Sequence, residues 1–184
     1  HAAIRALGRL ERRDVVTNLL PLLGSGSAET RELTAFAIAQ AMRGERLPLD
    51  PAGTQVDGVL TALLDAIGSE RDPSAIDGFA RSVARLPFER ADQVQRVDRV
   101  LGGNLAGRGS IAEAIRGAAA GLEVLARLHV KRAPVSERTI GQLRALASGR
   151  ARLVGSPDAA RDARLEGLRA LIAARGLDEE SLRV

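Results

Sequence analysis

The stretch VVTNLLPLLGSGSAETRELTAFAIAQAM, residues 15–42, contains two apolar segments separated by a short turn of glycine and serine. The Leu-rich segment predicts a helix over about 14–23, and the Ala-rich segment predicts a second helix over about 28–43. Ser27 precedes the second helix as an N-cap, because its side chain can accept a hydrogen bond from a free backbone N–H of the first turn. The stretch therefore predicts one unit of helix, tight turn and helix.

Three further caps repeat this unit along the chain. Asp72 and Ser156 each precede a proline, which suits an N-cap followed by proline at the first helical position. Ser110 and Glu113 have the spacing of a capping box. The caps predict first helices over about 55–68, 91–102 and 136–153, and second helices over about 74–86, 111–130 and 157–175.

A short phrase recurs in the second helices at a regular spacing. It reads ALGRL at 6–10, AIAQA at 37–41, SVARL at 82–86, VLARL at 124–128 and ALIAA at 170–174, so that its second residues lie 31, 45, 42 and 46 positions apart. One class of repeats built from helix pairs has a period of about 40–47 residues, and only the first step here is shorter. We therefore expect residues 1–184 to form a single repeat array, with units near 1–12, 14–43, 55–88, 91–130 and 136–175.

The segments VVTNLLPLLGSGSAE (15–29) and TRELTAFAIAQAM (30–42) resemble HEAT repeats, including the phycobilisome-lyase-like variety found in bacteria. They share its Leu-rich first helix, its turn and its Ala-rich second helix, and Arg31 matches an arginine near the start of that helix. The resemblance is good over 1–43, fair over 55–88 and weak over 91–175. It implies an all-α, right-handed α-α superhelix of about four antiparallel helix pairs, which belongs to the armadillo-type solenoids.

Composition narrows the classes of function. The chain has 27 basic and 23 acidic residues, a net charge of +4 and no cysteine, tryptophan or tyrosine. Without cysteine it forms no disulfide and no thiolate metal site. It contains no apolar run long enough to span a membrane. Because acidic residues are interspersed with the arginines, the charge excess is typical of a solvated surface in an arginine-rich composition.

The segment GGNLAGRGS, residues 102–110, is a weak candidate for a phosphate-binding loop. Gly102 and Gly107 have the required spacing, but Arg108 and Gly109 replace the Lys and the Ser or Thr of that motif. The segment is more typical of a helix stop at Gly102 and Gly103.

Other residue types used in catalysis or metal binding are too sparse or too far apart to form a site. His1 and His129 are distant in sequence, and we expect His129 to pack at a helix end over Val130 and Lys131. The adjacent Glu179 and Glu180 would point in different directions on a helix. We expect no catalytic residue, cofactor or metal.

Arginines near the polar side of the second helices are the strongest candidates for a binding surface. In HEAT-like arrays these helices line the concave face, and an arginine stripe there suits an acidic peptide. The expected function is a non-catalytic scaffold for protein–protein interaction. The alternatives are a lyase-like or accessory factor attached to an enzyme domain and backbone-mediated nucleic-acid binding, which the lack of Trp and Tyr disfavours. The candidate residues are Arg31, Arg81, Arg85, Arg116, Arg127, Arg164 and Arg169.

The phrase ALGRL at 6–10 has no first helix before it. We therefore expect the chain to be a fragment of a larger bacterial protein, with Ile4 and Leu7 exposed at that end unless something covers them. Self-association through this end is a corresponding expectation.

Overall fold

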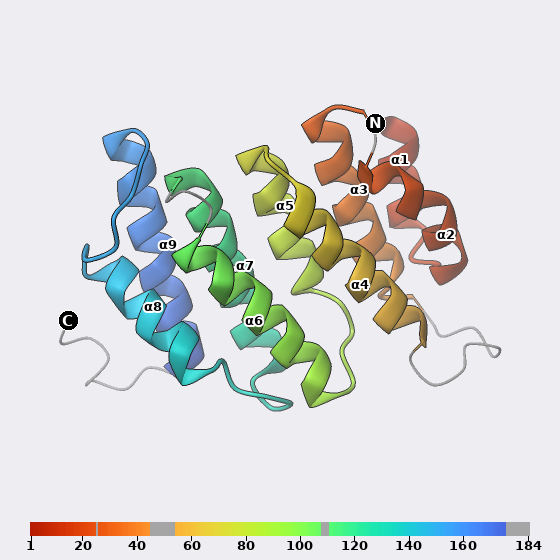
Figure 1. Cartoon of the computed structure of the whole chain (residues 1–184). Coiled ribbons are helices and arrows are strands. Elements are labelled where there is room, and N and C mark those ends of the chain that lie inside the picture. Colours follow the sequence, from red (N-terminus) through yellow and green to blue (C-terminus); the bar gives the residue numbers. More distant parts are fainter. Residues whose placement is uncertain (25, 45–53, 108–110, 176–184) are drawn as a thin grey trace.

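The computed structural model describes residues 1–24, 26–44, 54–107 and 111–175 (Figure 1). Within these ranges the chain is helical, and the predicted all-α solenoid of helix pairs is confirmed. The elements are α1 (Ala2–Arg9), η1 (Arg13–Val15), α2 (Val16–Leu19), η2 (Leu20–Gly24), α3 (Ala28–Ala41), α4 (Thr54–Ser69), α5 (Pro73–Val83), α6 (Ala91–Ala106), α7 (Ala112–His129), α8 (Glu137–Ala147) and α9 (Pro157–Arg175).

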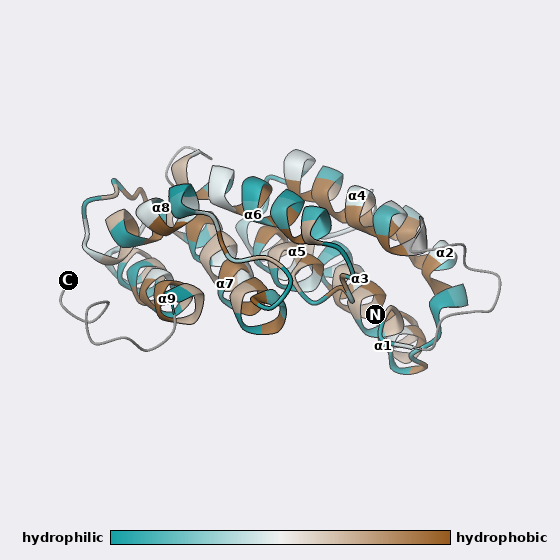
Figure 2. Cartoon of the chain, turned by 90° about the horizontal axis from the view of Figure 1, so that it is seen from below, coloured by the Kyte–Doolittle hydropathy of each residue, from teal (hydrophilic) through white to brown (hydrophobic). Residues whose placement is uncertain are grey.

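The helices form two layers that follow a shallow bow (Figure 2). The second helices of the pairs, α1, α3, α5, α7 and α9, make the inner layer, and each packs against the next. The outer layer contains the first helices, α2, α4, α6 and α8. The core lies between the layers and includes Ile38, Val83, Leu125 and Leu171, the second residues of four of the repeated phrases.

Glycines allow the inner helices to approach closely. A Cβ on Gly121 of α7 would lie 2.7 Å from the carbonyl oxygen of Ala80 on α5, and one on Gly117 would lie 2.7 Å from the Cα of Asp77. Gly8 of α1 is packed in the same way against Ala37 of α3, at 2.8 Å from its Cα. Real Cβ atoms are not found at such distances, so these three contacts depend on glycine.

Three predicted caps are present. The Oγ of Ser27 accepts from the N–H of Thr30, and the Oγ of Ser156 accepts from the N–H of Ala159. Asp72 accepts from two backbone N–H groups at the start of α5 and is followed by proline at the first position. These caps define where α3, α5 and α9 begin. Ser110, the fourth predicted cap, lies outside the described residues.

Two helices differ from their predicted form, one at a proline and the other at two glycines. The segment 14–23 is divided into η1, α2 and η2, because Pro21 lacks the N–H that an α-helix needs at that position. The helix expected to stop at Gly102 and Gly103 continues to Ala106, so that prediction was wrong. A Cβ on Gly102 would lie 2.3 Å from Oγ1 of Thr139, which shows that this glycine serves close packing of α6 against α8.

Other helix boundaries also differ from the prediction. The helix expected over 136–153 ends at Ala147, and Gly149 then takes a positive φ of 76° that turns the chain. The helix expected over 74–86 ends at Val83. None of the described helices has the length and apolar content needed to cross a membrane.

The N-terminal end is less open than predicted. Ile4 is only 8% exposed, because α1 packs against α3, and Leu7 is half-buried against the same core. The chain itself therefore covers much of these two side chains, and self-association through this end stays a prediction.

His129 is also placed differently from the prediction. It is buried at the end of α7, with its ring 4.8 Å from that of Phe88 and its Nε2 3.1 Å from the carbonyl oxygen of Ala84. Val130 and Lys131 are exposed beyond it. Burial lowers the pKa of His129, although the contact with Ala84 opposes this shift.

We expect Gly121→Ala to lower the free energy of unfolding by about 1–3 kcal/mol, because the added methyl group overpacks the contact with Ala80. The matched control is Gly141→Ala in α8, where the new Cβ meets no atom within 4 Å. Alanine favours a helix over glycine, so this variant should gain about 0.5–1 kcal/mol. Urea unfolding followed by circular dichroism measures both values, and equal effects would contradict the close packing of α5 and α7.

We expect the stability to fall as the pH decreases below about 6.5, the ordinary pKa of histidine. The unfolded chain then binds a proton at His129 that the folded chain, with its lowered pKa, resists. Urea unfolding between pH 7.5 and 5.5 tests this. The variant His129→Gln should show a weaker dependence over the same interval, and an unchanged dependence would assign the effect to other groups.

Candidate functional site

Three of the seven predicted arginines join one ion-pair network across the inner layer. Asp77 of α5 accepts from Nε of Arg81 at 2.7 Å and from Nη2 of Arg116 on α7 at 3.1 Å. Glu166 of α9 accepts from Nη1 of Arg169 at 2.9 Å, and Nη2 of Arg81 lies 3.8 Å from its other oxygen. Two largely buried carboxylates therefore neutralise these arginines and connect α5, α7 and α9.

Arg31 holds two repeats together. It donates from Nε and Nη2 to the two oxygens of Glu70, at 2.6 and 2.9 Å. Glu70 follows α4 and also accepts from the backbone N–H groups of Arg71 and Asp72, in the turn before α5. The hydrogen bond from Arg31 is the main cause that lowers the pKa of Glu70.

Arg127 and Arg164 lie apart from the network. Arg127 pairs with Glu123 one turn earlier on α7, with 2.5 Å between Nε and Oε1. Arg164 is exposed on α9, beside Gly149 in the connection between α8 and α9. The seven predicted arginines therefore do not share one ion-pair network among the described residues, and their role in binding a partner stays a prediction.

Arg85 lines a hollow on the inner layer. The hollow has a volume of about 430 Å³ and lies over α1, α3 and the end of α5. Its charge comes from four arginines, Arg5, Arg9, Arg43 and Arg85, and we call it the basic hollow. Among the described residues, no carboxylate forms an ion pair with any of these four arginines.

The floor of the basic hollow is apolar. The guanidinium carbon of Arg85 lies 6.0 Å from the ring centroid of Phe36, within the range of a cation–π contact. Leu33 and Phe36 are both half-buried and line the hollow together. Burial lowers the pKa of Arg85, and the positive charges of Arg81 and Arg43 lower it further, while the negative charge of Glu123 opposes the shift. The side chain stays cationic.

Sequence reasoning missed three of the four arginines of the basic hollow. Arg9 occupies the fourth position of its phrase, as Arg85 and Arg127 do in theirs, so aligning the phrases would have identified it. Arg5 precedes Arg9 by four residues and shares its helix face. Arg43 follows α3 in a turn, and no repeat pattern indicates that it meets arginines of two other helices.

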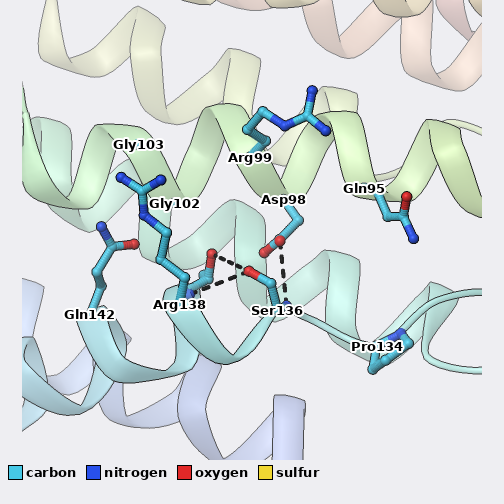
Figure 3. Close-up of a pocket in the computed structure, with 10 residues that line it drawn as sticks. Gln95, Asp98, Arg99, Gly102, Gly103, Pro134, Ser136, Arg138 and Gln142 are labelled. Carbon is cyan, nitrogen blue, oxygen red and sulfur yellow. Dashed lines mark hydrogen bonds between the residues drawn. The ribbon is translucent and has the colours of Figure 1, made fainter.

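A larger hollow of about 540 Å³ lies on the outer layer between α6 and α8 (Figure 3). Its polar groups hold these helices together: Asp98 accepts from the N–H of Ser136 at 3.3 Å, and Ser136 caps α8 through Thr139. The other oxygen of Asp98 is buried and has no hydrogen-bond partner among the described residues. Gly102 lines this hollow from within α6, which rules out the phosphate-binding loop considered for this segment.

Comparisons with known proteins give little beyond the fold. No protein-family model matches the chain, and no curated protein matches it. One solved structure that it resembles is the designed armadillo repeat protein YIII(Dq)4CqI, with 16% sequence identity and a TM-score of 0.44, over 94% of this chain and 92% of that chain. Likeness at this level carries no argument about binding, and the resemblance to phycobilisome-lyase-like HEAT repeats stays a hypothesis.

We expect Arg31→Ala to lower the free energy of unfolding by about 2 kcal/mol, because it leaves the largely buried Glu70 without its charged partner. Arg43→Gln should change stability by no more than about 0.5 kcal/mol, since Arg43 is exposed in the basic hollow. Urea unfolding at pH 7 compares the two variants. If both variants lost a similar amount of unfolding free energy, Arg31 would not differ from Arg43 in holding the fold together.

Proposed function

We propose that this chain is a non-catalytic scaffold that binds an acidic segment of a partner protein along its inner layer. The observation that carries this proposal is the uneven neutralisation of the arginines. Asp77 and Glu166 neutralise the part of the layer formed by α5, α7 and α9, whereas the basic hollow has four arginines without a described carboxylate partner.

The chemistry of the basic hollow suits a carboxylate-rich peptide. Guanidinium groups bind carboxylates through paired N–H donors, and several such groups in one place raise both the affinity and the rate of encounter. Phe36 and Leu33 add an apolar surface that can receive an aliphatic or aromatic side chain next to the acidic one. The combination favours a segment in which acidic and apolar residues alternate closely.

The carboxylates of the inner layer support a binding role over a catalytic one. Asp77 and Glu166 are each held by two arginines, and Glu70 is held by Arg31 and two backbone N–H groups. Carboxylates held by several donors are fixed in place, which suits a structural role better than a catalytic one. In the described part of the chain no three His, Cys, Asp or Glu side chains are grouped so that they could hold a metal ion.

The test is a selection from a library of random 12-residue peptides on the purified chain, followed by fluorescence anisotropy of labelled peptides. We expect the selected peptides to be rich in Asp and Glu and to bind the variant with Arg5→Glu and Arg43→Glu at least about tenfold more weakly, because the charge reversal repels them. The matched control carries Arg99→Glu and Arg138→Glu in the outer hollow and should bind within about twofold of the original chain.

Two results would contradict the proposal. One is a set of selected peptides without acidic enrichment, and the other is an equal loss in the two double variants. Preferential binding of a mixed-sequence oligonucleotide, with an affinity that falls steeply with salt, would favour nucleic-acid binding instead.

A further inference from the structure

We propose that the basic hollow binds a phosphate monoester, carried on a side chain of the partner segment. This inference rests on the proposed function, since it specifies the group that the inner layer recognises. It depends on the number of cations in the hollow, on their surroundings and on the shape of the floor.

The number of cations favours a dianion over a single carboxylate. Arg5, Arg9, Arg43 and Arg85 line one hollow of about 430 Å³. A carboxylate brings one negative charge, whereas a phosphate monoester brings about 1.5 to 2 at pH 7 and three acceptor oxygens. Several guanidinium groups can bind those oxygens at once, each with two N–H donors. The hollow therefore has more positive charge and more donors than one carboxylate can use.

Four like charges line one hollow in the free chain. Arg5 and Arg9 are separated by one helical turn, and like charges at this spacing destabilise a helix by a few tenths of a kcal/mol. Burial is the main cause of the lowered pKa of Arg85, and the positive charge of Arg43 lowers it further, while the negative charge of Glu123 opposes the shift. A bound dianion would relieve the repulsion between these positive charges. This relief would add to the free energy of binding.

Tertiary packing brings these arginines together around an aromatic floor. Gly8 lets α1 lie directly against Ala37 of α3, and this contact places Arg5 and Arg9 on the same hollow as Phe36. The hollow is several times larger than a phosphate group, and its floor contains Leu33 and Phe36. This shape suits a phosphate on an apolar stem better than a free phosphate ion.

Phenyl phosphate is the first probe, because it joins a phosphate monoester to an apolar ring. Two comparison compounds each lack one of these parts. Phenylacetate has the ring but no phosphate group, and inorganic phosphate has no ring. We expect phenyl phosphate to shift backbone NMR signals around the hollow and to bind at least about tenfold more tightly than either comparison compound. Arg43→Gln with Arg85→Gln should remove this preference, whereas the control with Arg99→Gln and Arg138→Gln in the outer hollow should keep it.

The pH dependence provides a second readout. The second pKa of a phosphate monoester is about 6, so the affinity for phenyl phosphate should rise between pH 5.5 and 7.5 as the dianion forms. The affinity for phenylacetate should stay level, because a carboxylate is ionised throughout this interval and the arginines do not titrate. Equal pH profiles for the two compounds would overturn the inference.

Peptides separate failure of this inference from failure of the proposed function. One selected acidic peptide is made in three forms, with serine, glutamate or phosphoserine at the same position. We expect phosphoserine to bind at least about tenfold more tightly than glutamate. Equal affinity of the phosphoserine and glutamate forms overturns phosphate recognition and leaves the scaffold proposal standing. If Arg43→Gln with Arg85→Gln leaves the affinity of all three forms unchanged, both proposals are overturned.

Discussion

Close contact between the backbones of the inner helices is the constraint on which the rest of this structure depends. Gly121 and Gly117 of α7 meet the backbone of α5, and Gly8 of α1 meets that of α3, at distances that no side chain could occupy. Because these helices lie so close, charged side chains on neighbouring repeats can reach one another. The ion pairs and the basic hollow of the inner layer are consequences of this packing.

The same close packing produces two kinds of surface. Across α5, α7 and α9 it brings Arg81, Arg116 and Arg169 to the carboxylates of Asp77 and Glu166, and the charges cancel. At α1 and α3 it gathers arginines around Phe36, with no carboxylate pairing with them among the described residues. Under the proposed function, a layer with both arrangements is rigid in one part and attracts an anionic partner in another.

The fold could be predicted because its signals are local. Ser27, Asp72 and Ser156 cap helices through N–H groups two or three residues away, and the repeated phrases supply buried residues at helical spacing. The candidate site was only partly predictable, because an arginine on a polar helix face looks the same whether or not a carboxylate from another repeat reaches it. Arg31 and Arg85 illustrate this: the first is bound to Glu70, and the second faces the hollow.

The sequence by itself therefore determined the all-α array, its helix pairs and most of its caps, since these depend on hydrogen bonds and apolar spacing within one repeat. Only the tertiary structure decided that Gly102 packs inside a helix, that His129 is buried against Phe88, and which arginines remain available. The physical reason is distance along the chain. Helix formation is decided within a few residues, whereas a charge or a glycine takes its role from a neighbour about 30 to 45 residues away.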